Sequence, residues 1–176
     1  MEENKYFFQT DDMIYSLKIE KAVMNKILLL CKGSDKIETG SILLGYYTPK
    51  HDIAVVTDIS SPPPDSQRGH TSFVRGVKGL QKWLHHMWVR QRRFYLGEWH
   101  FHPFNDPAPS STDIDQLKKF SETPSLRCPE PIMVIVGGDP NNMWTLRVYI
   151  ALRGLPVREM VASKNIIPEI NRKMVN

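Results

Sequence analysis

Two histidines one residue apart are the side chains of this sequence best suited to bind a metal ion. His100 and His102 are followed by Pro103, then by Ser110 and, three residues later, by Asp113. Side chains along a strand alternate with a period of two, so both histidines would project from one face. A helix that begins at Ser110 would bring Asp113 back toward the same place. Two imidazoles and one carboxylate leave a zinc ion with an open position for water, which is typical of catalytic zinc. The pattern predicts a zinc hydrolase.

Each half of this pattern also has a simpler structural explanation. Histidine pairs occur in ordinary cores and on strand surfaces, and Ser110-x-x-Asp113 is similar to a capping box at the start of a helix. With both halves joined through Pro103, the structural explanation needs two coincidences and the metal explanation needs one. The two roles are also compatible, because Asp113 has two carboxylate oxygens. The metal site is therefore the favoured interpretation.

A zinc hydrolase needs a general base near the attacking water, and two glutamates compete for this role. Glu98 lies two residues before His100, on the same face of the predicted strand. Glu38 precedes the segment 39–45, whose small residues would let a neighbouring backbone approach closely. Spacing alone does not choose between them.

The rest of the sequence interleaves strand and helix patterns, which indicates one α/β domain over 1–176 with a mixed sheet. Alternating or β-branched runs predict strands at 13–19, 38–47, 53–59, 94–102, 131–136, 143–151 and 155–161. Helical spacing predicts a helix at 19–30 that stops at Gly33, a second one carrying Val77, Leu80, Leu84, Met87 and Trp88, and a third at 113–120. We expect a Pro-rich loop at 61–69. We also expect mobile ends at 1–12 and at 166–176, the latter as a short helix or a frayed tail.

Composition narrows the class of protein and its compartment. Hydrophobic residues make up 41% and charged residues 24%, as in soluble globular proteins, and the net charge of +4 is only mildly basic. The basic run Arg90–Arg93 follows a helical pattern, so a nucleic-acid partner is not expected. Cys31 and Cys128 are far apart and lack metal-binding spacing, which favours a reducing compartment, with Cys31 in the core. The longest aliphatic run, 27–30, is too short to cross a membrane. We expect a cytoplasmic protein.

A longer set of residues resembles a known family. Glu38 with Gly40, Leu43 and Gly45, followed by His100-x-His102-Pro103 and Ser110-x-x-Asp113, is similar to the JAMM signature of the JAB/MPN zinc metalloproteases. The resemblance implies a single JAB/MPN-like domain with a mixed, curved sheet flanked by helices. It also implies zinc ligands at His100, His102 and Asp113, a general base at Glu38, and support of the tetrahedral intermediate by Ser110. Glu98 then has a structural role beside the metal ligands and is not the general base.

Two positions depart from the signature of this family. Phe101 stands between the histidines, where Ser or Thr is usual, and Ser41 replaces a glycine in the glutamate strand. Strand alternation points Phe101 away from the metal side, so the expected ligands survive. Members that serve as metal-free scaffolds lose one or more of the catalytic groups, and this sequence keeps all of them.

The resemblance also implies a substrate class. Family members cleave an isopeptide or peptide bond just after the glycine-ended tail of a ubiquitin-like protein. Such a tail binds in an extended form, and the loops around Pro63, His70 and Phe104 are best placed to line its groove, although they also fit ordinary surface loops. The segments 97–100 and 109–113 look most like small prokaryotic members. Some of these remove a protein conjugated to the C-terminal tail of a nucleotidyltransferase (CD-NTase) in CBASS anti-phage systems.

Two other functions stay open at this point. A zinc hydrolase of this kind could process a sulfur-carrier protein in biosynthesis. A non-catalytic MPN-type interaction module is the second alternative, and it predicts no tightly bound zinc and no effect of substituting Glu38.

Overall fold

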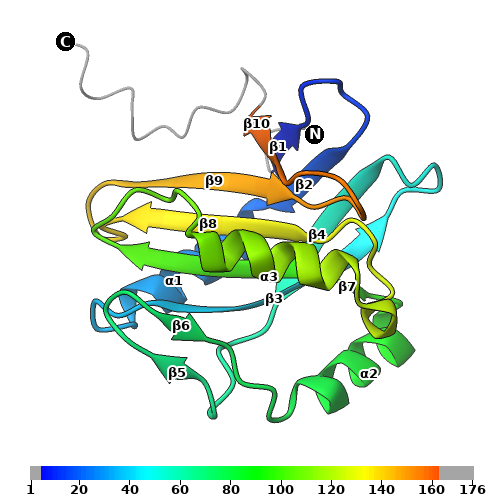
Figure 1. The fold of residues 1–176 in the computed structure, drawn as a ribbon. Coiled ribbons are helices and arrows are strands. Elements are labelled where there is room, and N and C mark those ends of the chain that lie inside the picture. Colours follow the sequence, from blue (N-terminus) through cyan, green and yellow to red (C-terminus); the bar gives the residue numbers. More distant parts are fainter. Residues whose placement is uncertain (1–4, 163–176) are drawn as a thin grey trace.

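The computed structural model describes residues 5–162, and Figure 1 shows their arrangement. The strands are β1 (Lys5–Gln9), β2 (Ser16–Glu20), β3 (Thr39–Tyr47), β4 (Ile53–Ile59), β5 (Gln67–Arg68), β6 (Phe73–Val74), β7 (Phe94–Pro103), β8 (Ile132–Gly138), β9 (Trp144–Ile150) and β10 (Arg158–Ala162). The helices are α1 (Lys21–Lys32), α2 (Leu80–Gln91), α3 (Ser111–Ser121) and the 3-10 turn η1 (Pro124–Leu126).

Eight of these strands form one curved sheet that closes on itself in the order β1-β10-β9-β8-β7-β3-β4-β2. The pairs β2–β4 and β7–β8 are parallel and the others are antiparallel. The expected α/β fold with a mixed, curved sheet and flanking helices is therefore confirmed. The two short strands β5 and β6 pair only with each other, as a hairpin outside this sheet.

The two faces of the sheet carry different layers. Inward side chains of the closed sheet join one side of α1 in the main core, which includes Leu17, Ile27 and Trp99. On the outer face, α3 packs through Leu117 onto β8 and β9, and α2 packs onto β3 and β7 in a separate cluster. In Figure 1, α3 crosses in front of β7 and β8, with the β5–β6 hairpin below the edge of β3. The outer face of β7 thus lies between a helix and a hairpin.

Most predicted elements have a counterpart within a few residues. The predicted strand 53–59 coincides with β4, it pairs with β3 across the turn at 48–52, and α1 ends with its C-cap at Gly33. Two edges differ. Val77 precedes α2 and is 69% exposed, because α2 begins only after the left-handed Gly79. β10 begins at Arg158, later than the predicted strand.

The expectation of a mobile end at 1–12 is wrong for residues 5–9, which form β1. β1 pairs with β2 over its whole length and with β10 through Phe8 and Gln9. Phe8 is buried in the main core, so this short strand both closes the sheet and contributes apolar surface. The expectations for 166–176 lie outside the described residues.

A bulge in β7 changes which of its side chains face the core and which face outward. Leu43 of β3 pairs with Gly97 and Leu44 pairs with Tyr95, so Leu96 has no partner on β3. Leu96 is buried in the main core together with Trp99, three residues later. A strand without a bulge would place these two side chains on opposite faces. The extra residue therefore lets β7 fill the core before the bulge and still direct Glu98 to the outer face.

Gly97 makes this bulge sterically feasible, and we predict that Gly97→Ala strongly destabilises the fold. Its φ is +142°, and a Cβ there would lie 1.8 Å from the carbonyl oxygen of Ile132. Backbone strain and overpacking together should lower the free energy of unfolding by about 2–5 kcal/mol. Gly154→Ala is the matched control, since φ is +75° and, apart from its chain neighbours, no atom of residues 5–162 lies within 4 Å of an added Cβ, so we expect a loss of about 1 kcal/mol. Chemical denaturation measures both values. Equal losses in the two variants would contradict this explanation.

The cysteines and the lack of a long apolar helix are two further features that the sequence predicted. Cys31 and Cys128 are both buried and unpaired, and Cys31 lies in the main core as predicted. Within residues 5–162, no helix is both long enough and apolar enough to span a membrane.

Candidate metal centre and active site

Strand β7 presents both histidines on the outer face of the sheet. Glu98, His100 and His102 alternate with Trp99 and Phe101, and the latter two are fully buried in the main core. Phe101 thus points away from the histidines, as strand alternation predicted. His100 is 4% exposed, and His102 lies nearer the surface.

The N-terminus of α3 holds the acidic member of the group. Ser110 is the N-cap: its Oγ accepts a hydrogen bond from the Asp113 amide at 3.1 Å. Asp113 Oδ2 accepts two bonds in return, from the Ser110 amide at 2.8 Å and from the Ser110 hydroxyl at 2.7 Å. This reciprocal capping box fixes the rotamer of Asp113 and leaves its second oxygen, Oδ1, for other partners.

The three predicted ligands converge. Asp113 Oδ1 lies 3.0 Å from His100 Nδ1, and Asp113 Oδ2 lies 3.7 Å from His102 Nε2. One ligand atom from each of these three residues lies within 4.8 Å of the other two. Among residues 5–162, no other group of three or more His, Cys, Asp and Glu side chains lies close enough together to hold a metal ion. The histidine pair of β7 and the aspartate at the start of α3 thus meet at one site.

Charges in this group compensate one another. Burial opposes a positive charge on His100, but the carboxylates of Asp113 and Glu98 outweigh it and raise the pKa of His100 to about 9. Burial alone would raise the pKa of Asp113, whereas its bonds to His100 and Ser110 hold it well below the usual carboxyl range. Burial lowers the pKa of His102.

Glu38 lies immediately before β3 and beside this group. β3 and β7 pair so that Gly40 is opposite His100, and a Cβ on Gly40 would come within 2.9 Å of the His100 ring. Burial first, and then the charge of Asp113, raise the pKa of Glu38, while His100 opposes the shift. The half-buried Glu38 carboxylate is therefore in electrostatic contact with two members of the candidate metal group.

The competing glutamate is enclosed. Glu98 is fully buried, and its Oε1 accepts a hydrogen bond from Arg75 Nε at 2.9 Å and forms an ion pair with Arg75 Nη2 at 2.8 Å. A buried carboxylate already bound to a guanidinium is poorly suited to accept a proton from water. The geometry thus distinguishes two glutamates that spacing left equal.

Sequence reasoning placed the segment 70–75 beside a substrate groove, but it missed the contacts that Phe73 of β6 and Arg75, directly after β6, make with the site. Arg75 pairs with Glu98, and Phe73 contacts the His100 ring edge to face, with centroids 5.5 Å apart. A glutamate on the same strand face as two metal ligands is often partly buried and then needs a cation nearby, which was a usable signal. It could not identify Arg75, because the pairing spans 23 residues across an irregular loop.

The loops expected to line a substrate groove differ in exposure. Pro63 is buried, whereas His70 is exposed and its Nδ1 lies 3.3 Å from the Lys36 carbonyl oxygen. Phe104 follows β7 directly and is 57% exposed, with Lys36 Nζ 5.8 Å from its ring centroid. Their assignment to a substrate groove stays a prediction.

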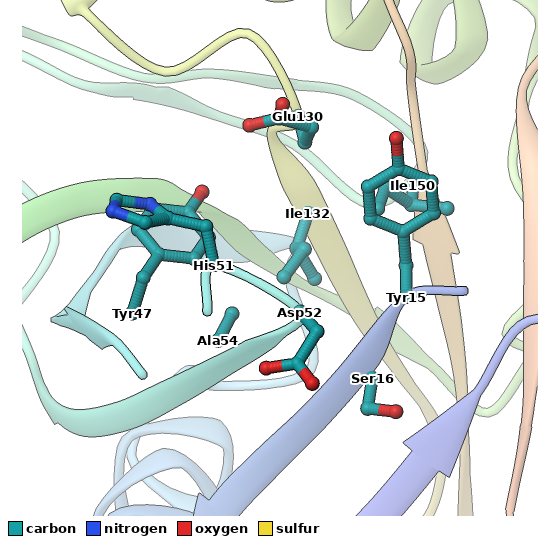
Figure 2. Close-up of a pocket in the computed structure, with 9 residues that line it drawn as sticks. All are labelled: Tyr15, Ser16, Tyr47, His51, Asp52, Ala54, Glu130, Ile132 and Ile150. Carbon is teal, nitrogen blue, oxygen red and sulfur yellow. The ribbon is translucent and has the colours of Figure 1, made fainter. Parts of the chain in front are cut away.

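A small pocket lies at the other end of β7 and β8, away from the metal group. It is lined by Ile132, at the start of β8, and by Tyr47, His51 and Glu130, whereas His102 pairs with Gly137 near the end of β8. Figure 2 shows the ring of His51 against that of Tyr47 and the Glu130 carboxylate on the same side. None of the predicted site residues lines this pocket.

A closed, mixed sheet with two histidines and an aspartate converging beside a half-buried glutamate defines a small α/β domain built around a metal-competent site. The chain belongs to the prokaryotic homologues of the JAB domain, because the model of that family matches residues 20–149. The family resemblance inferred from the sequence is confirmed.

Individual relatives agree with this family. The chain is 34% identical to a CD-NTase/cGAS isopeptidase of Enterobacter hormaechei over 86% of this chain and 84% of the relative. It is 27% identical to a probable metalloprotease of Sinorhizobium fredii, over 75% of this chain and 81% of the relative. A solution structure from Desulfitobacterium hafniense superposes with a TM-score of 0.60 at 17% identity, over 80% of this chain and 87% of the other. That last likeness shows the fold alone.

Proposed function

We propose that this chain is a zinc-dependent peptidase that cleaves the bond after the C-terminal glycine of a ubiquitin-like protein or of a conjugated protein tail. The observation that carries the proposal is the convergence of His100, His102 and Asp113 beside the half-buried Glu38. Membership of the JAB family and the names of the relatives, isopeptidase and probable metalloprotease, support a peptidase.

The donor set fits zinc. Two imidazoles and one carboxylate are typical ligands of catalytic zinc, and this combination leaves a coordination position for substrate or water. His100 Nε2 is buried without a hydrogen-bond partner in the described part of the chain while Nδ1 faces Asp113, so the ring is fixed but one of its nitrogens has no partner there. Bound there, zinc would supply Lewis acidity toward the scissile carbonyl and the attacking water.

The protein's own groups divide the remaining work. Glu38 accepts the proton of the attacking water and returns it to the leaving amine, and its raised pKa makes it a stronger base than an exposed carboxylate. Ser110 is proposed to donate a hydrogen bond to the developing oxyanion. The Ser110 hydroxyl donates its proton to Asp113 Oδ2, so this role requires the hydroxyl to turn toward the substrate.

The proposed substrate segment is an extended tail. Because the main sheet is closed, the β5–β6 hairpin offers the free strand edges within residues 5–162, and it lies beside the metal group. A tail could add backbone hydrogen bonds at that edge, as peptides do at other exposed strands. The loops around Pro63, His70 and Phe104 flank this path, and exposed Phe104 would contact apolar side chains of the tail.

The proposed cellular role is to reverse the conjugation of a CD-NTase in a CBASS anti-phage system, in the cytoplasm. The name of the Enterobacter hormaechei relative supports this choice over processing of a sulfur carrier. The test compares three purified substrates: a protein fused to the C-terminal tail of the cognate CD-NTase, a ubiquitin-like protein linked through an isopeptide bond, and a sulfur-carrier precursor.

We expect the zinc-loaded protein to cleave the CD-NTase linkage at least about tenfold faster than the others, measured as kcat/KM, a difference of about 1.4 kcal/mol. Faster cleavage of the sulfur-carrier precursor would contradict the proposed substrate and identify the sulfur carrier as the substrate instead. Zinc-loaded protein that cleaves none of the three would contradict the peptidase proposal and favour an interaction module.

A further inference from the structure

The buried Glu98 is held by a residue of the hairpin outside the main sheet. Both Arg75 contacts, from Nε and Nη2, end on the same carboxylate oxygen, Oε1, and Tyr95 Oη lies 3.5 Å from that oxygen as well. The Arg75 side chain is only 14% exposed, so this ion pair is shielded from water. Charge-assisted bonds in such a setting fix the plane of the carboxylate. Oε1 is therefore fully used, and Oε2 is directed elsewhere.

The second oxygen of Glu98 faces a metal ligand. Oε2 is buried with no hydrogen-bond partner among residues 5–162, and so is His100 Nε2, and these two atoms lie 3.7 Å apart. Buried polar atoms without partners are rare in native proteins because each one carries a desolvation penalty. A movement of less than 1 Å would join this pair into a hydrogen bond.

We propose that Glu98 is a positioning residue for His100 and that Arg75 acts through Glu98. His100 Nε2–H donates to Glu98 Oε2, which fixes the tautomer of the imidazole and leaves Nδ1 as the metal-binding nitrogen. This inference rests on the proposed function, in which His100 is a zinc ligand. Histidine ligands of zinc generally donate their other N–H to a carboxylate or carbonyl, which fixes the ring and makes it a better ligand.

The loop around Arg75 is built to hold this side chain in place. Asp65 accepts hydrogen bonds from the amides of Val77 and Lys78, both at 3.0 Å, and Ser66 Oγ accepts one from the Gly76 amide at 3.0 Å. The segment from 65 to 78 is thus closed at its base directly next to Arg75. Arg75 Nη1 also donates to the Gly76 carbonyl oxygen at 3.0 Å.

The test measures zinc affinity by competition with a chromophoric chelator, together with the imidazole ¹H–¹⁵N NMR signals of the zinc-loaded protein. The variants are Glu98→Gln, which keeps the shape of the side chain, Arg75→Met, and the double variant. Arg68→Met is the matched control, because Arg68 lies in the same hairpin and bonds to the Glu38 carbonyl oxygen without contacting Glu98. Zinc chloride is the probe.

We expect Glu98→Gln to weaken zinc binding by about 10- to 100-fold and to move the Nε2–H proton signal of His100 upfield, because the acceptor of its hydrogen bond loses its charge. Arg75→Met should weaken it by about tenfold, and the double variant should bind zinc no more weakly than Glu98→Gln alone, because Arg75 acts only through Glu98. Arg68→Met should match the wild type in both readouts. A merely structural role would change the unfolding temperature and leave the Nε2–H signal of His100 unchanged.

The failures of the two proposals are distinguishable. Wild-type protein that takes up no zinc would overturn the proposed function and this inference with it. Wild-type protein that binds zinc while Glu98→Gln binds it equally tightly would overturn the inference alone. Additive losses in the double variant would assign Arg75 a separate effect and contradict its action through Glu98.

Discussion

Glu38→Gln is expected to retain the zinc of this protein and to reduce hydrolysis by about 10²- to 10⁴-fold, the usual contribution of a positioned general base. Glutamine has nearly the same shape but does not accept a proton from water. Burial and the charge of Asp113 both raise the pKa of Glu38, so the native carboxylate is a stronger base than an exposed one. Single-turnover kinetics on the cleaved conjugate measure the loss, and elemental analysis measures zinc per chain.

Glu130→Gln is the matched control for this substitution. Burial raises the pKa of Glu130 as it does that of Glu38, but Glu130 lines the pocket of Figure 2 at the opposite end of β8. Its removal should leave both zinc content and rate unchanged. Near-normal activity of zinc-loaded Glu38→Gln would contradict the assignment and transfer the role of base to Glu98. Loss of zinc in Glu38→Gln would instead make Glu38 part of the metal site.

The parts of the site that are local in sequence could be predicted. The period of two along β7 placed His100 and His102 on one face, and a Ser-x-x-Asp pattern placed Asp113 at a helix start. Both inferences depend on backbone geometry within a few residues, where steric rules and hydrogen bonding dominate. The signature of the family then related these pieces to Glu38, across about sixty residues, which no local rule could have done.

The parts that depend on distant pairing could not be predicted in this way. β1 closes the sheet by pairing with β10 through residues about 150 positions away, and its own five residues carry little pattern. The bulge at Leu96 reverses which side chains of β7 face the core, and Gly97 is the only feature of the sequence pattern there that indicates it. The Arg75–Glu98 pair joins an irregular loop to a strand. In each case tertiary contacts, not local propensity, decide the outcome.

Asp113→Asn is expected to cost the protein its zinc and, with it, its activity. The neutral amide keeps an oxygen that can accept the Ser110 amide bond, so the helix cap survives in part, but the ligand loses its negative charge. Removal of a direct ligand should weaken zinc binding by more than the 10- to 100-fold typical of an outer partner, that is by about 10³-fold. After extensive dialysis, elemental analysis should find about one zinc per wild-type chain and almost none in the variant.

Ser110→Ala separates the loss of a ligand from the loss of a helix cap. It removes the hydroxyl that donates to the Asp113 carboxylate and accepts from the Asp113 amide. This loss should lower the free energy of unfolding by about 1 kcal/mol. The Asp113 carboxylate itself stays free to bind metal. We therefore expect zinc to remain in Ser110→Ala and to be lost from Asp113→Asn, although the latter is the smaller disturbance of the cap. If both variants retained zinc equally after dialysis, the metal would not be held by the group of His100, His102 and Asp113. If both lost it equally, the capping box itself would be what organises the ligands, and the charge of Asp113 would be secondary.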